Sequence, residues 1–149
     1  MKSHRILVLL SLVMSLAACS KGGSSDVLSV KGENVLTYQI ATADPVTGGV
    51  QIDDLAYVDF DKSRLIVADF NVCFRVVPLT AGDLEALREA ILYANAGQSQ
   101  AQAACASSTD SYKVTSLQLT SDLAVCGTAL KDMLDEIMSR PATRLCKAL

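Results

Sequence analysis

Histidine is almost absent from this chain of 149 residues, since the only one is His4, near the amino terminus. The surrounding segment has the pattern of a signal that is removed during export. Without a histidine, the remaining chain has no Ser-His-Asp or Cys-His catalytic arrangement, because both need an imidazole as general base. Zinc or copper sites with histidine ligands are excluded for the same reason.

Basic clusters and long apolar runs are also missing. Once residues 1–18 are removed, 131 residues remain with 11 basic and 16 acidic side chains, a net charge of −5. Such a chain has the length of one domain. Its charge argues against nucleic acid as a partner and against a polybasic patch for a membrane surface. The apolar run at residues 6–16 is too short for a transmembrane helix, which needs about 20 residues.

The amino-terminal segment has three parts. Lys2 and Arg5 make it positive, and residues 6–16 are then apolar apart from Ser11 and Ser15. Small residues follow. A charged start, a short apolar middle and a small-residue end are typical of a cleaved secretory signal.

The segment ends in Leu-Ala-Ala-Cys at residues 16–19. This tetrapeptide resembles the lipobox of bacterial lipoproteins. The resemblance implies that the Cys19 thiol carries diacylglycerol, that the chain is cut just before it, and that the new amino group is acylated too. Two or more acyl chains hold a protein stably on a bilayer. The alternative is an ordinary signal peptide that is cut after Ala17.

The residues after Cys19 indicate a location and a tether. In enterobacterial lipoproteins an aspartate at this position favours the inner membrane, so Ser20 implies an outer-membrane protein facing the periplasm. Residues 20–25, Ser-Lys-Gly-Gly-Ser-Ser, have the composition of a flexible linker. We therefore expect a signal peptide at residues 1–18, a lipidated cysteine and linker at residues 19–30, and a single globular domain at residues 31–149.

Four cysteines follow Cys19, and an even number in an exported chain indicates two disulfides. A Cys₄ metal site is the alternative, but the spacing lacks the paired C-x₂-C form. Three connectivities are open. Our prediction pairs them in sequence, Cys73 with Cys105 and Cys126 with Cys146.

The first half of the domain has the alternation of β-strands. Leu36, Tyr38 and Ile40 predict a first strand, and the proline and glycines of residues 44–49 predict a turn. Two longer runs then predict a hairpin joined at residues 61–63. Apolar side chains share one parity in each run, and they should lie on one face.

The hairpin also has an expected register. Val58 should face Ile66, and the second strand should continue without a break to Val76. Asp54 interrupts the apolar parity of the first run. We attribute this interruption to a bulge or to a strand end.

Two helices and a further strand follow. Thr80, with an acid three residues later, should cap a helix that ends at Gly97. Residues 98–111 are interpreted as a loop with a helical turn, residues 112–119 as a strand with a bulge near residues 115–116, and residues 128–139 as a second helix. The predicted fold class is α+β. We expect a small, mainly antiparallel sheet in the order β-β-β-α-β-α with two helices on one face.

Acidic residues cluster around the predicted hairpin. Paired carboxylates serve acid–base chemistry or bind Ca²⁺, while the alternative is a solvated strand edge and hairpin tip. The chain has no D-x-[DN]-x-[DN]-G calcium loop. The acids are Asp53, Asp54, Asp59, Asp61 and Asp69.

The parity pattern places a second apolar set on the opposite face of the hairpin. An apolar patch with a polar rim is typical of an interaction surface. The alternative is that another part of the chain covers this patch. The candidate surface consists of Asp53, Leu55, Tyr57, Asp59, Leu65, Val67 and Asp69.

Together these features favour a non-enzymatic, lipid-anchored binding or accessory module of the bacterial envelope. Its partner would be an envelope protein or an envelope polymer, and no cofactor is expected. The alternative is a carboxylate-dependent periplasmic hydrolase. The missing histidine and the lack of a nucleophile motif count against that enzyme, whereas two acids at glycosidase separation in a pocket would favour it.

Overall fold

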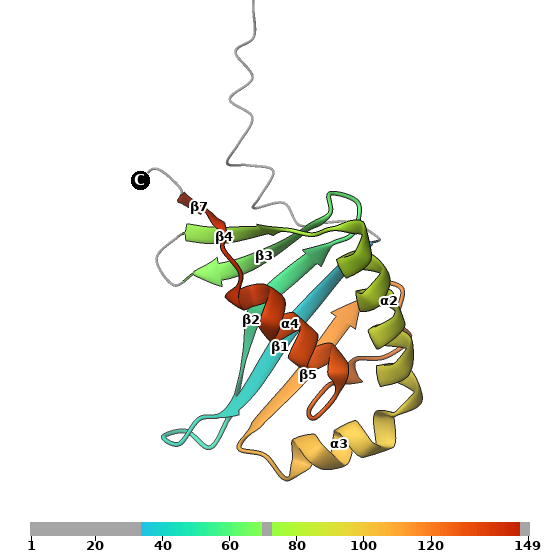
Figure 1. The fold of residues 1–149 in the computed structure, drawn as a ribbon. Helices are drawn as coiled ribbons and strands as arrows, with labels where there is room; N and C mark the ends of the chain where they lie inside the picture. The colour runs from blue at the N-terminus through green and yellow to red at the C-terminus, as the bar shows by residue number, and fades with distance from the viewer. Residues whose placement is uncertain (1–33, 70–72, 147–149) are drawn as a thin grey trace, which may run out of the picture.

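The computed structural model describes residues 34–69 and 73–146 of the chain. The predicted signal peptide at residues 1–18 and the predicted lipidated cysteine and linker at residues 19–30 lie outside these residues. Within the described residues, three helices and a seven-stranded antiparallel sheet agree with the predicted α+β class (Figure 1). The strands are β1 (Val35–Ala43), β2 (Val50–Asp59), β3 (Arg64–Asp69), β4 (Cys73–Pro78), β5 (Asp110–Ser116), β6 (Leu123–Ala124) and β7 (Thr143–Cys146). The helices are α2 (Ala81–Ala96), α3 (Gln98–Ala106) and α4 (Ala129–Ser139).

The order of elements differs from the predicted β-β-β-α-β-α. Four strands precede the helices, and the sheet runs β6-β5-β1-β2-β3-β4-β7. Helix α3 forms where a loop was predicted, because its many alanines have the highest helix propensity of all residues. The short strands β6 and β7 were not predicted, since two and four residues are too few for an alternating pattern.

The long second strand of the predicted hairpin is in fact two strands. β3 ends at Asp69, and β4 begins at Cys73 and runs back beside it, with Ile66 opposite Val76. Each even-numbered residue of β3 lies opposite an even-numbered residue of β4. The even-numbered side chains of both strands therefore lie on the same face of the sheet. Periodicity alone therefore could not show that the chain turns back.

The predicted register of the β2–β3 hairpin is wrong by one residue. Val58 lies opposite Leu65 rather than Ile66, because Asp59 pairs with Arg64. The connection thus has four residues instead of the three that were predicted, and Ser63 takes a positive φ of 48° in it. A shift of one residue turns a whole strand over, so Leu65 and Val67 face the core.

One of the two predicted bulges is present. The pairing of β1 with β2 shifts between Tyr38 and Gln39, which leaves Leu55 as the extra residue of β2. This confirms the bulge beside Asp54. The bulge predicted near residues 115–116 is wrong, since β5 pairs with β1 without a shift along its whole length.

The core lies between one face of the sheet and the helices. Figure 1 shows α4 crossing in front of the sheet, with α2 beside it. Leu130, Leu134 and Ile137 of α4 are fully buried against the sheet. The strand side chains of the core are Leu36, Tyr38, Ala56, Val58, Leu65, Val67, Val77, Val114 and Leu123.

One polar contact joins this core to α4. The buried Tyr38 hydroxyl donates to Asp135 at 3.0 Å, and Lys131 lies 4.4 Å from the ring of Tyr112, which packs on Tyr38. Burial, reinforced by Asp135, raises the pKa of Tyr38 well above its usual value. The phenol therefore stays a neutral donor, and its hydrogen bond links β1 to α4.

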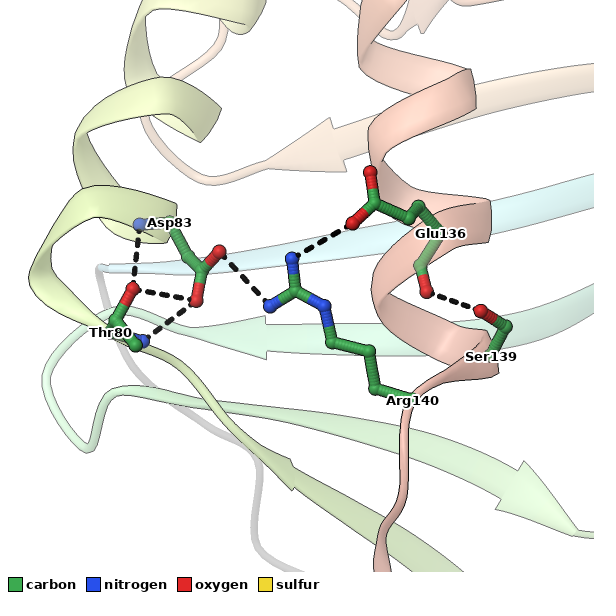
Figure 2. A network of polar contacts seen from close by, with 5 residues as sticks. All are labelled: Thr80, Asp83, Glu136, Ser139 and Arg140. Carbon is green, nitrogen blue, oxygen red and sulfur yellow. Dashed lines mark hydrogen bonds and ion pairs between the residues drawn. The ribbon is translucent and has the colours of Figure 1, made fainter.

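Helix α2 begins with the predicted cap. Asp83 accepts from the backbone N–H and the hydroxyl of Thr80, each at 2.8 Å, and its own N–H donates to Thr80 Oγ1 at 3.1 Å. Arg140, just after α4, donates to Asp83 at 3.0 Å and to Glu136 at 3.1 Å (Figure 2). A single carboxylate thus caps α2 and holds the end of α4 beside it.

We expect Asp83→Asn to lower the free energy of unfolding by about 0.5–2 kcal/mol at pH 7, the usual worth of a helix cap. The backbone hydrogen bond from Thr80 holds the pKa of Asp83 below its usual value. The contribution is therefore present above the unfolded pKa of about 3.9 and is lost as the pH falls through the lower folded pKa. Urea unfolding at pH 7 and at pH 3 measures it.

Glu85→Gln is the matched control, because Glu85 is an exposed acid of the same helix. It should change stability by less than about 0.5 kcal/mol at either pH. The difference in unfolding free energy between wild type and Asp83→Asn should be smaller at pH 3 than at pH 7. An unchanged difference would show that the cap does not depend on the negative charge of Asp83.

Two disulfides are present, as predicted, but their predicted pairing is wrong. Cys73 bonds to Cys146, and Cys105 bonds to Cys126. Strand β7 pairs with β4 and places Cys146 directly opposite Cys73. Helix α3 carries Cys105 to the segment that follows β6. The first and the last of the four cysteines are spatial neighbours because β4 and β7 meet at one edge of the sheet, and the two middle cysteines bond to each other.

Candidate functional site

Strand β2 is longer than the neighbour on its β3 side. Only its last four residues, Ala56 to Asp59, pair with β3, whereas pairing with β1 extends back to Val50. Within the described chain, residues 50–55 therefore have a partner strand on one side only. We call these residues the open β2 edge. In Figure 1, β1 and β2 diverge from β3 and continue toward the lower left.

The bulge decides which side chains this edge displays. Leu55 packs against the core, and the shift in pairing moves Val50 and Ile52 to the sheet face opposite the helices. The sequence placed these two residues on the same face as Ala56 and Val58, which is wrong. They are instead 70% and 53% exposed, so an apolar strand edge lies open to solvent.

A small polar cluster lies beside this apolar edge. Asp54 accepts from Gln39 Nε2 at 2.6 Å and from the Tyr57 hydroxyl at 2.5 Å. Burial, together with Asp54, raises the pKa of Tyr57 to about 12, so the phenol remains a neutral donor at neutral pH. Asp53 accepts from Gln51 Nε2 at 3.1 Å.

The two carboxylates at the edge therefore have neutral donors only. Among the ion pairs of the described residues, none includes Asp53 or Asp54. Adjacent strand residues point to opposite faces, so one carboxylate lies on each side of β2. The edge consequently presents negative charge on both of its faces.

The predicted binding surface does not exist as a single face. Leu65 and Val67 are 0% and 6% exposed and belong to the core, as the corrected register requires. Leu55 is half-buried against the same core. Tyr57 alone of the four apolar residues lies on the outer face, beside Asp54.

The acids of that predicted surface are also separated. Asp59 is only 6% exposed, and it accepts from the Lys62 N–H at 3.0 Å and from Arg64 Nε at 3.1 Å. Asp69, at the end of β3, pairs with Arg144 of β7 at 3.0 Å. Of the predicted set, only Asp53 and Leu55 belong to the open β2 edge.

Val50, Ile52 and Gln39 were missed as members of a functional site. The parity of the sequence placed Val50 and Ile52 in the core, since a bulge of one residue leaves no sign of which strand residue is extra. The open edge itself depends on β3 and β4 being separate strands. The one sequence feature that indicated this region is Asp54, which interrupts the apolar alternation of the predicted strand.

A hollow of about 340 Å³ lies at the opposite end of β2 from the open edge. Apolar side chains from the sheet and from α2 line it, and the Arg88 guanidinium lies 5.1 Å from the Phe60 ring centroid at its wall. None of the described residues that line it is acidic. It therefore does not supply the pair of carboxylates that the hydrolase alternative requires.

The described residues, 34–69 and 73–146, contain no group of three His, Cys, Asp or Glu side chains placed to hold a metal ion. They also contain no helix with the length and apolar character needed to cross a bilayer.

No family model, curated protein or solved structure matches this chain. Its function is therefore inferred from two features of the molecule itself. These are the lipobox resemblance at residues 16–19 and the open β2 edge.

Proposed function

We propose that this protein is a lipid-anchored, non-enzymatic binding module of the bacterial envelope that recognises a protein partner at the open β2 edge. The observation that carries the proposal is the single-sided pairing of residues 50–55. Exposed strand edges are usually short, charged or covered, because they pair readily with other chains. An edge of six residues with exposed Val50 and Ile52 is therefore suited to recognition.

The anchor in this proposal is the acylated Cys19. The lipobox resemblance supports it, and Ser20 supports an outer-membrane location facing the periplasm. Residues 20–33 then connect the anchor to β1.

The hydrolase alternative receives less support from the geometry. Glycosidase chemistry needs two carboxylates that face the same bond. Asp53 and Asp54 lie on opposite faces of β2, and Asp59 and Asp69 are each held by an arginine. The chain after the signal also has no histidine.

A photo-crosslinking amino acid at position 52 of the full chain tests the proposal in cells. We expect a specific adduct with an envelope protein, identified by mass spectrometry, in the membrane fraction. Leu117, an equally apolar residue that is 82% exposed at the end of β5, is the control position and should give no adduct. Cys19→Ser should move the domain out of the membrane fraction.

Adducts at position 117 alone, or none at position 52, would contradict the binding role of the edge. Full membrane retention of the Cys19→Ser chain would contradict the lipid anchor. The two parts of the proposal are thus tested separately.

A further inference from the structure

We propose that the open β2 edge binds an extended, cationic segment of the partner by adding it to the sheet as a strand next to β2. This inference rests on the proposed function and names the partner class for the same site. In strand addition, main-chain hydrogen bonds supply affinity, and side-chain contacts on alternate residues supply specificity. The partner is therefore defined by its backbone shape as well as by its charge.

The edge is already held in the conformation that an added strand needs. β1 pairs with β2 along residues 50–59, and β5 pairs with the other edge of β1 from Leu36 to Thr42. Residues 50–55 thus form one edge of the part of the sheet that consists of β5, β1 and β2. A strand fixed in this way offers its backbone donors and acceptors without a further loss of conformational entropy.

The position next to this edge is not taken by β3. β3 pairs with β2 only as far as Val67, opposite Ala56. Its last two residues, Ala68 and Asp69, remain paired with β4, as the rest of β3 is, but have no partner in β2. Among the described residues, residues 50–55 thus have a backbone partner strand on the β1 side alone.

The side chains of the edge indicate what an added strand should carry. Val50 and Ile52 project on the outer face, and an apolar or β-branched residue of the partner would pack beside them. Asp53 lies on the other face, and Asp54 continues the row of Ile52. Neither carboxylate has a cation within ion-pair distance among the described residues, so lysine or arginine on the partner would complement both.

The same charges disfavour a second copy of this chain as the occupant. Pairing two β2 edges would bring Asp53 and Asp54 of one copy against those of the other, and like charges across strands are destabilising. The net charge of −5 after the signal adds to this repulsion. A cationic heterologous segment meets neither penalty.

The first test uses a synthetic peptide, Thr-Lys-Lys-Val-Thr-Val-Thr, with the complete chain after Cys19, because its adjacent lysines lie on opposite faces of an added strand, as Asp53 and Asp54 do. We expect saturable binding at low salt and slower amide exchange at residues 50–55 in the complex. The same peptide with N-methyl groups on alternate amides should bind at least tenfold more weakly, because it cannot complete the ladder. The peptide with both lysines changed to glutamate should bind at least tenfold more weakly as well.

Asp53→Asn with Asp54→Asn should remove most of the preference for lysine over glutamate. Glu89→Gln is the matched control, since Glu89 is an exposed acid of helix α2 and lies outside the open β2 edge. It should leave both affinities unchanged.

Several results would overturn the inference. They are equal binding of the N-methylated peptide, no slowing of exchange at residues 50–55, no binding of the lysine peptide up to millimolar concentration, or self-association of the chain through this edge. If any of these results were obtained while position 52 still gave an adduct in cells, the edge would still be a binding site. Only the addition of a cationic strand would then be contradicted. Loss of that adduct would remove the proposed function.

Discussion

Replacing Leu65 by alanine should lower the free energy of unfolding by about 2–5 kcal/mol, the usual cost of emptying a buried leucine site. Leu65 is 0% exposed and lies between Val58 and Val77 in the ladder. On this face the helices pack over the sheet, so the surroundings have little room to close a cavity. Urea unfolding, followed by circular dichroism, gives the difference.

Leu117→Ala is the matched control for this change. The two substitutions remove the same atoms, but Leu117 is 82% exposed beyond the end of β5, so its loss should cost less than about 0.5 kcal/mol. A mild effect of Leu65→Ala would contradict the burial of Leu65 between Val58 and Val77. The pair of variants therefore tests whether this side chain is part of the core.

Removal of the Cys73–Cys146 disulfide by a double alanine variant should cost about 4 kcal/mol, and removal of Cys105–Cys126 about 3 kcal/mol. The first bridge closes a sequence separation of 73 residues and the second a separation of 21. A longer loop has more conformational freedom when it is released. The unfolded state therefore gains more entropy from the first change.

Denaturant unfolding of both double variants measures these costs. Non-reducing peptide mapping of the unmodified protein checks the pairing independently, and should find a peptide that joins Cys73 to Cys146. A peptide that joins Cys73 to Cys105 would contradict the fold at β7. If the variant without Cys105–Cys126 proved much the less stable, the entropy of the released loop would not be the main source of the stabilisation.

Local signals allowed much of the fold to be predicted. Thr80 and Asp83 define the start of α2 within the sequence itself, and Thr128 does the same for α4. The alternation around Tyr38 predicted β1, and the misplaced Asp54 predicted the bulge. In each case the deciding contacts lie within a few residues along the chain.

The remaining features depend on contacts between distant residues. The loop before Arg64 contains one residue more than predicted, and this alone turned β3 over. The disulfide partner of Cys73 is fixed by where β7 returns to the sheet. The open β2 edge was not predictable for the same reason, since it depends on where a neighbouring strand ends.

The bulge at Leu55 also separates β2 residues that can be substituted freely during evolution from β2 residues that are fixed by core packing. On the core side of the bulge, Ala56 and Val58 are packed in the core, and β2 lies between two neighbouring strands. Beyond it, Val50 and Ile52 contact solvent, and substitutions there should leave the core unaffected. Recognition specificity in this fold could therefore drift or be engineered at a strand tip without a corresponding loss of folding stability.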